Sequence, residues 1–183
     1  MSMIGTALTT WEEFLELPDS DENGELRYEL HDGEVVLVPP PKPIHVLIQW
    51  RMEELLKAAA KGLGTAKTEF PYRPAPNLQF WRADVAYIPS EHLRLMETDE
   101  YLIYAPPLIV EVLSPSNRPG KIQRQRIATF SGGTREFWVV DPVRRTVEVS
   151  LPGKPSRVYG EHEEIPVAIL PGVSISARKI FTE

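Results

Sequence analysis

The sequence predicts an α/β fold in a single domain that spans residues 1–183. Two apolar runs of strand length, Leu108–Leu113 and Glu136–Val140, flank a polar segment of helical length, Lys121–Ser131. This order of strand, crossover helix and strand is typical of a parallel pair in a buried sheet. An alternating segment around the turn His31-Asp32-Gly33 indicates an antiparallel hairpin. We therefore expect a mixed central sheet flanked by helices, with an extra N-terminal hairpin and short C-terminal strands.

The N-terminal part predicts a short helix, a hairpin and a long helix. Glu12 and Glu13 lie in the first turn of the short helix, where the helix dipole favours acidic side chains. The long helix follows a proline-rich break, carries an apolar stripe at helical spacing and ends at Gly62 and Gly64. The predicted ranges are Thr9–Leu17 for the first helix, Leu26–Leu30 and Glu34–Val38 for the hairpin strands, and Ile44–Lys61 for the long helix.

One side of this long helix carries a polar row of His45, Gln49 and Glu53 at positions i, i+4 and i+8. The row lies beside the apolar stripe, so its side chains share one edge of the helix. It is either a solvated flank or part of a site, and the spacing alone favours neither interpretation.

The remaining chain predicts strands separated by turns. A proline-rich turn separates the first two strands, and a mostly polar loop with one short helical turn near Glu91–Met96 follows them. After the central strand–helix–strand unit, weaker alternation indicates short terminal strands. The additional predicted strands are Thr65–Tyr72, Gln79–Ile88, Thr146–Leu151, Arg157–Tyr159, Val167–Leu170 and Val173–Ile175.

Composition excludes several classes of protein and site. The chain has no cysteine, which excludes disulfides, zinc–thiolate sites and cysteine nucleophiles. No apolar run approaches the roughly 20 residues that span a bilayer, and the N-terminus lacks the pattern of a signal peptide. We therefore expect a cytoplasmic protein with no membrane partner. Because the net charge is −6, a face that binds nucleic acid must be local. The best candidate is the segment with Arg118, Lys121, Arg124 and Arg126.

Two carboxylates interrupt apolar strands. Asp84 lies within the strand Gln79–Ile88, and Glu111 is flanked by apolar residues on both sides. Burying such a charge is unfavourable unless a partner compensates it. If the two strands pair, the carboxylates converge and repel each other unless a cation lies between them, and oxygen ligands suit Mg²⁺ or Mn²⁺. Alternatively, each carboxylate caps a loop or pairs with an arginine such as Arg82 or Arg135.

Other hydrolytic chemistries lack their patterns in the sequence. No glycine-rich phosphate loop opens a helix, because Gly132 and Gly133 follow one. The four histidines show no H-x-x-x-H spacing, which argues against a zinc hydrolase. Ser114 and Ser116 lie in a turn segment without the surroundings of a nucleophile elbow.

Several segments together resemble a known family. RADVAYI, PPLIVEVLSPSN, a polar helix and GTREFWVVDP follow one another, and TTWEEFLELP and RYELHDGEVV precede them. In this order and spacing they resemble the bacterial restriction-endonuclease-like family of the PD-(D/E)XK nuclease superfamily, over roughly residues 9 to 150. The resemblance implies a restriction-endonuclease-like αβββαβ core and Mg²⁺-dependent hydrolysis of DNA phosphodiester bonds.

The resemblance also assigns roles to the two acids. Asp84 matches the motif aspartate, although the proline that usually precedes it is Ala83 here. Glu111 matches the second acidic position, which makes the pair the expected metal ligands. Glu29 in the segment RYEL is the third acidic member by the same resemblance; the alternative is an exposed strand glutamate.

The family's lysine is absent from both positions where the resemblance places it. Two residues after the second acid the chain has Leu113, and the corresponding position on the following helix is Gln125. Glutamine can position a water molecule but carries no charge. Lys121 lies one i, i+4 step away on the same helical face and could replace the lysine. We therefore count Gln125, Lys121 and Glu29 with Asp84 and Glu111 as candidate catalytic residues.

The resulting hypothesis is a Mg²⁺- or Mn²⁺-dependent endonuclease that acts on duplex DNA. Its phosphate contacts would come from Arg118, Arg124, Arg126 and His45. A homodimer is expected because cutting both strands needs two active sites. The alternative is a catalytically weakened or inactive nuclease fold that serves as a binding or assembly module, which Gln125 and the acidic net charge favour. Hydrolysis of another phosphoester is a third possibility.

Overall fold

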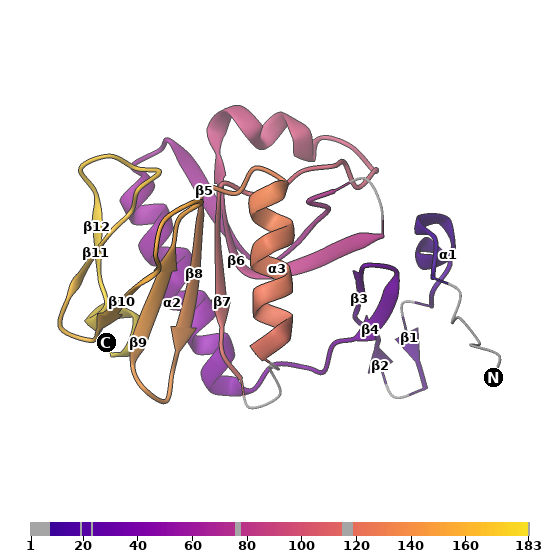
Figure 1. The fold of residues 1–183 in the computed structure, drawn as a ribbon, viewed down its shortest axis with the longest axis horizontal. Coiled ribbons are helices and arrows are strands. Elements are labelled where there is room, and N and C mark those ends of the chain that lie inside the picture. The colour runs from indigo at the N-terminus through magenta and orange to yellow at the C-terminus, as the bar shows by residue number, and fades with distance from the viewer. Residues whose placement is uncertain (1–7, 19, 23, 76–77, 115–118, 183) are drawn as a thin grey trace.

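The computed structural model describes residues 8–18, 20–22, 24–75, 78–114 and 119–182. Its centre is an eight-stranded sheet in the order β10-β9-β8-β7-β6-β3-β4, with β5 paired to β6 beside this path (Figure 1). The strands are β3 (Tyr28–His31), β4 (Glu34–Leu37), β5 (Gly64–Tyr72), β6 (Gln79–Pro89), β7 (Leu108–Val112), β8 (Glu136–Asp141), β9 (Thr146–Ser150) and β10 (Arg157–Gly160).

Helices and two small ribbons complete the fold. The ribbons are antiparallel pairs at the two ends of the chain. Within the described ranges, no helix combines the length and the apolar character that crossing a membrane requires. The helices are α1 (Trp11–Leu15), α2 (Pro43–Ala60), α3 (Pro119–Ser131), α4 (Arg178–Phe181) and the 3₁₀ helix η1 (Ser90–Met96). The ribbon strands are β1 (Ser20–Asp21), β2 (Gly24–Glu25), β11 (Glu164–Pro166) and β12 (Ser174–Ser176).

The predicted mixed sheet is confirmed. β7 and β8 are parallel, with Glu111 opposite Val139, and α3 forms the connection between them. Every other strand pair of the sheet is antiparallel within the described residues. Both β7 and β8 are buried along their whole length because helices cover the sheet on both faces.

The two faces of the sheet bury different cores. On one face, Ile48, Met52 and Leu56 of α2 pack with Val110 and its neighbours. On the other face, α3 packs through Ile122 against a second cluster. The clusters meet at β6, where Val85 and Tyr87 belong to the α2 side, whereas Trp81 and Ala83 belong to the α3 side. Regular alternation of side chains along a strand is thus broken at Asp84.

The residue across from this break is strained. Glu69 on β5 has a φ of 52°, a left-handed conformation that is uncommon for a residue other than glycine. Its neighbours Thr68 and Phe70 pair with Val85 and Ala83 on either side of Asp84. The sheet therefore changes its packing face at the position of two acidic residues, and strain of this kind is often retained at functional sites.

The predicted N-terminal hairpin is present and joins the sheet at the start of β6. β3 pairs with β4 along its length, and Leu30 and His31 pair with Phe80 and Gln79. Leu30 and Phe80 also form a small core with Phe14 of α1. This core fixes β3 beside β6, so Glu29 of β3 faces the central sheet.

Two predicted elements differ from the structure. Helix α1 is shorter than the predicted Thr9–Leu17: it begins after Thr10, which caps it by accepting the backbone N–H of Glu13, and it ends at Leu15. The predicted strand Val167–Leu170 is wrong, since these residues form tight turns in which Leu170 donates to the carbonyl of Val167. Val167 and Leu170 are buried, so apolar spacing here reflects a turn that faces the core.

Candidate functional site

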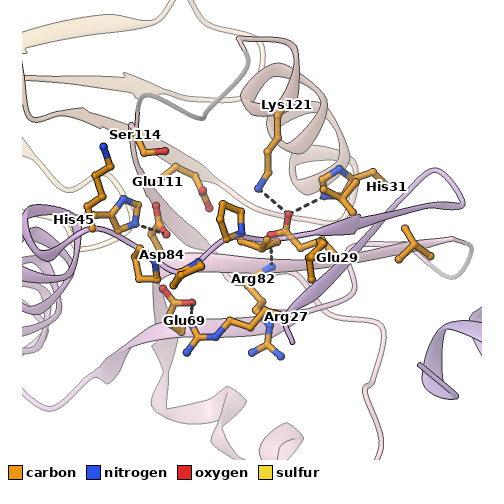
Figure 2. Close-up of a pocket in the computed structure, with 18 of the residues that line it drawn as sticks. Arg27, Glu29, His31, His45, Glu69, Arg82, Asp84, Glu111, Ser114 and Lys121 are labelled. Carbon is orange, nitrogen blue, oxygen red and sulfur yellow. Dashed lines mark hydrogen bonds and ion pairs between the residues drawn. The ribbon is translucent and has the colours of Figure 1, made fainter. Parts of the chain in front are cut away.

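A pocket of about 660 Å³ lies where α2, α3 and the β3–β4 hairpin meet the sheet (Figure 2). Its walls come from segments far apart in the sequence and carry both acidic and basic side chains. Six of the predicted site residues line it: Glu29, His45, Asp84, Glu111, Lys121 and Arg124.

Strand register places three acidic residues in a row at the base of this pocket. The pairs Phe70–Ala83 and Thr68–Val85 put Glu69 across from Asp84. The pair Val85–Val110, continued by one residue, puts Asp84 across from Glu111. Neighbouring strands lie about 4.8 Å apart. The two predicted acidic strands therefore pair next to Asp84 and Glu111, and the charge of Asp84 acts on the Glu111 carboxyl group.

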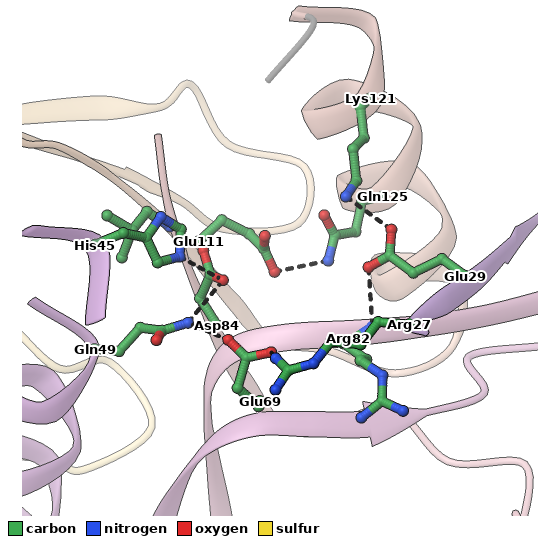
Figure 3. Close-up of polar contacts among 11 residues, drawn as sticks. Arg27, Glu29, His45, Gln49, Glu69, Arg82, Asp84, Glu111, Lys121 and Gln125 are labelled. Atoms are coloured by element: carbon green, nitrogen blue, oxygen red, sulfur yellow. Dashed lines mark hydrogen bonds and ion pairs between the residues drawn. The ribbon is translucent and has the colours of Figure 1, made fainter. Parts of the chain in front are cut away.

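Asp84 is oriented by donors from α2 and β7 (Figure 3). Its Oδ1 lies 2.9 Å from Nε2 of His45 and 3.0 Å from Nε2 of Gln49, and its Oδ2 accepts the backbone N–H of Val112 at 2.6 Å. Because an ionised carboxylate only accepts, the imidazole donates. The polar row of the long helix thus belongs to the site through its first two members, whereas Glu53 pairs with Lys57.

Glu69 shares these contacts. Nε2 of Gln49 donates to Oε1 of Glu69, and a guanidinium N–H of Arg27 donates to Oε2 at 3.0 Å. His45, Glu69 and Asp84 each offer one ligand atom within 4.8 Å of the others. Burial alone would lower the pKa of His45, but its hydrogen bond to Asp84 and the charges of Asp84 and Glu69 raise it.

Glu111 is a buried acid with a single hydrogen-bond donor among the described residues. It is buried and accepts from Nε2 of Gln125 at 2.7 Å; the same amide nitrogen lies 3.1 Å from the hydroxyl of Tyr72. Burial and the neighbouring charge of Asp84 raise the pKa of Glu111 well above its ordinary value of 4.5. The amide oxygen of Gln125 is buried and, among the described residues, has no hydrogen-bond partner. This corner of the site has excess negative charge and an unused acceptor.

Glu29 forms the opposite wall with Lys121. Oε2 of Glu29 lies 2.7 Å from Nζ of Lys121 and 2.9 Å from Nε2 of His31, and Oε1 accepts the backbone N–H of Arg82 at 3.2 Å. Burial would raise the pKa of Glu29, but the hydrogen bond from His31 and the charge of Lys121 lower it. Glu29 is only 2% exposed, which rules out the exposed strand glutamate.

The donor set fits a divalent cation. Oxygen atoms of Asp84, Glu111 and Glu69 are ligands that Mg²⁺ and Mn²⁺ accept, and His45 adds a nitrogen within reach. Burial, and after it the charge of Asp84, raises the pKa of Glu111, so a cation beside both acids would stabilise their ionised forms. Glu111 is not part of the compact group of His45, Glu69 and Asp84, and it adjoins that group through Asp84.

The residues predicted to contact DNA do not lie together on one surface. Arg124 is exposed at the pocket, whereas His45 faces Asp84. Arg126 is ion-paired at 2.9 Å with Glu148 of β9 and does not line the pocket. Arg118 lies outside the described residues.

Sequence reasoning missed Glu69 and Tyr72. The pairing of Tyr72 with Trp81 shows a hairpin centred on the proline-rich turn. Counting outward from that turn would have placed Glu69 across from Asp84. The contact of Tyr72 with Gln125 depends on how α3 packs on the sheet, and no local pattern reports it.

Comparisons with known proteins agree with this arrangement. The model of the family described as "Uma2: Putative restriction endonuclease" matches residues 11–178. The crystal structure of a putative nuclease belonging to DUF820 from Anabaena variabilis ATCC 29413 superimposes with a TM-score of 0.78 at 23% sequence identity. The match covers 94% of this chain and 97% of that chain. No curated protein matches the chain. The predicted restriction-endonuclease-like fold is thereby confirmed.

Proposed function

The chain belongs to the Uma2 family, and we propose on this premise that it is a divalent-metal-dependent endonuclease acting on DNA. Membership of this family and the fold support a nuclease-like function. The observation that carries the finer proposal is the convergence of Asp84 and Glu111 on paired strands at the base of a charged pocket. Glu111 is buried there with a raised pKa.

We assign the metal to Asp84 and Glu111, with Glu69 and His45 as further donors within reach. A bound Mg²⁺ or Mn²⁺ would supply a water of lowered pKa and would polarise the phosphate. His45 and Gln49 hold the Asp84 carboxylate in one orientation, and Gln125 holds Glu111. These contacts restrict the rotamers of both acids before any ligand arrives, which favours a site of fixed geometry.

The residues of α3 complete the proposed site. Lys121 and Gln125 lie on the same face of α3, one turn apart, and both side chains reach the acidic residues of the pocket (Figure 3). Either residue would orient the attacking water. Arg124 at the pocket, together with Arg118, would contact the phosphate backbone of duplex DNA. Cleavage of both strands would use a homodimer.

Plasmid cleavage tests this proposal. The parent protein in Mg²⁺ or Mn²⁺ should nick or linearise supercoiled DNA, and Glu111→Ala should be slower by at least about 100-fold. Glu54→Ala is the matched control, since Glu54 is an exposed glutamate on the outer part of α2. A Glu111→Ala protein that cleaves as well as the parent would refute the assignment.

A second candidate is a nuclease fold that binds DNA without cleaving it. The observation in its favour is Gln125, which is neutral and donates through one nitrogen toward both Glu111 and Tyr72. Duplex binding by the parent in Mn²⁺, with no cleavage at any enzyme concentration, would favour this candidate.

A further inference from the structure

We propose that the segment between β6 and β7, residues 90–107, carries a docking surface for a basic amphipathic helix of a partner protein. The segment contains η1 and runs outside the sheet, at the top of the view in Figure 1. The inference goes beyond the proposed function, because this surface shares no lining residue with the pocket of the candidate site. The name η1 surface is used for its four apolar residues Leu95, Met96, Tyr101 and Leu102.

The side chains of the η1 surface gather around one hollow. A globular domain buries most of its large apolar side chains and leaves the others scattered singly over its surface. The four residues of the η1 surface are instead 38–43% exposed, and all of them line a hollow of about 260 Å³ against β5. Phe70 and Tyr72 of β5 line the same hollow. A contiguous apolar patch of this kind marks an interaction site.

The backbone beneath this surface is held in place by the rest of the fold. A guanidinium N–H of Arg73 donates to the carbonyl of Tyr101 at 3.2 Å, and the backbone N–H of Tyr104 donates to the carbonyl of Arg73 at 2.7 Å. The Tyr101 ring packs edge-on against Phe80, with ring centroids 5.0 Å apart. The exposed side chains therefore start from a fixed backbone, which lowers the entropic cost of binding a partner.

The size of the hollow favours side chains of a protein over a small molecule. Pockets that enclose small ligands usually have volumes of about 300–1,000 Å³, and this hollow has about 260 Å³. It can take one or two apolar side chains that project from a larger partner. Leucine and methionine walls suit this role, because methionine in particular adapts its shape to the side chains it meets.

The charge around the hollow selects the chemistry of the partner. Glu97, Asp99 and Glu100 are exposed, and the segment holds one further acid, Glu91, against a single arginine, Arg94. An acidic rim repels the phosphates of nucleic acids and of anionic lipids, and it attracts lysine and arginine. An apolar centre with an acidic rim is complementary to a helix whose apolar face is flanked by basic residues.

Anisotropy of a fluorescein-labelled, 18-residue amphipathic peptide of lysine and leucine tests the proposal. The parent protein should bind it with a Kd of about 10 µM or lower, and a peptide with glutamate in place of lysine should bind at least about tenfold more weakly. Leu95→Ser/Met96→Ser should weaken binding of the basic peptide by at least about tenfold. The matched control, Ile127→Ser/Val158→Ser, removes two exposed apolar side chains elsewhere and should bind like the parent.

A second pair of variants tests the acidic rim at constant net charge. Neutralising the three acids of the rim should weaken binding by at least about tenfold at low ionic strength, and neutralising three exposed glutamates elsewhere should not. The two variants are Glu97→Gln/Asp99→Asn/Glu100→Gln and Glu16→Gln/Glu54→Gln/Glu164→Gln.

Three results would overturn the proposal. They are absence of binding to the parent, equal weakening in a variant and its control, and a parent dimer in sedimentation that Leu95→Ser/Met96→Ser dissociates. The last result would show that a second copy of this chain covers the η1 surface. Because the titration contains neither metal nor DNA, its outcome is independent of the endonuclease proposal.

Discussion

Two glutamates on adjacent parallel strands look alike in the sequence and differ in their surroundings. Glu111 on β7 and Glu136 on β8 are 4% and 0% exposed. Burial raises the pKa of both carboxyl groups. Burial and the direction of the pKa shift are therefore the same in both glutamates and do not separate a functional residue from a structural one.

Their partners separate them. Glu136 accepts from the indole N–H of Trp138 at 2.9 Å and from the backbone N–H of Ile169 at 3.2 Å, so it binds the C-terminal segment to the sheet. Glu111 accepts from the amide of Gln125 and lies beside the acid of Asp84. A buried strand carboxylate is therefore not in itself a sign of function, and the second acid beside Glu111 is what the proposed function rests on.

The largest expected contrast is in cleavage. If Glu111 is the proposed metal ligand, Glu111→Gln should reduce DNA cleavage by at least about 100-fold, because an amide would not replace an anionic ligand. Its metal-free stability should be equal to or greater than that of the parent, since a buried charge beside Asp84 is removed. Glu136→Gln should cleave like the parent. Plasmid assays and urea unfolding measure both effects, and equal loss of cleavage in the two variants would remove the distinction.

The opposite pattern, a loss of stability without a loss of metal binding, is expected when Glu136 is replaced. Glu136→Ala should lower the free energy of unfolding by about 1–3 kcal/mol, because the indole N–H of Trp138 and the backbone N–H of Ile169 lose their buried acceptor. Urea denaturation of the parent and the variant measures this change. Mn²⁺ affinity should stay within twofold of the parent. Unchanged stability would mean that Glu136 does not hold the C-terminal segment.

A smaller effect is expected from the residue that orients the acids. Gln49 donates to both Asp84 and Glu69, so Gln49→Ala should weaken Mn²⁺ binding by about tenfold without removing a metal ligand. Lys57→Ala on the same helix serves as the control. Calorimetric titration with Mn²⁺ measures the affinity of both variants. Parent-like affinity in Gln49→Ala would show that Gln49 is not needed to orient Asp84 and Glu69.

The smallest effect is in the pH dependence of stability. Because the folded-state pKa of Glu111 is raised above 4.5, its favourable contribution is fully present below that value and is lost as pH rises through the folded pKa. Without metal, the parent and Glu111→Gln should therefore converge in stability near pH 4 and diverge at higher pH, the variant becoming the more stable. Urea unfolding across pH 4 to 8 measures this. Saturating Mn²⁺ should reverse the sign at the alkaline end of this range, because only ionised Glu111 would bind the ion.

Much of the fold could be predicted because its signals are local. The apolar runs Leu108–Leu113 and Glu136–Val140 and the helix between them specify a parallel pair without knowledge of the rest of the chain. Val167–Leu170 was misassigned because buried turns and short strands share the same apolar residues. The turn type depends on hydrogen bonds between backbone groups that residue spacing does not encode.

The site could be predicted only in part, because some of its residues give no signal within their own segment of the sequence. Asp84 and Glu111 interrupt apolar strands, so each is visible in its own segment. Glu69 lies in a strand of mixed polarity, and its role follows from register and from a left-handed backbone conformation. The contact of Glu29 with Lys121 joins residues 92 positions apart in the printed sequence and depends on hairpin docking.

The proposed metal site is tested most directly by calorimetric titration of Mn²⁺ into the parent protein, Asp84→Asn and Glu136→Gln. Binding to the parent and to Glu136→Gln, together with its loss in Asp84→Asn, is the predicted result and would locate the ion at the converging acids. Absence of binding to the parent, both without and with DNA, or undiminished binding to Asp84→Asn, would contradict a metal site at this position.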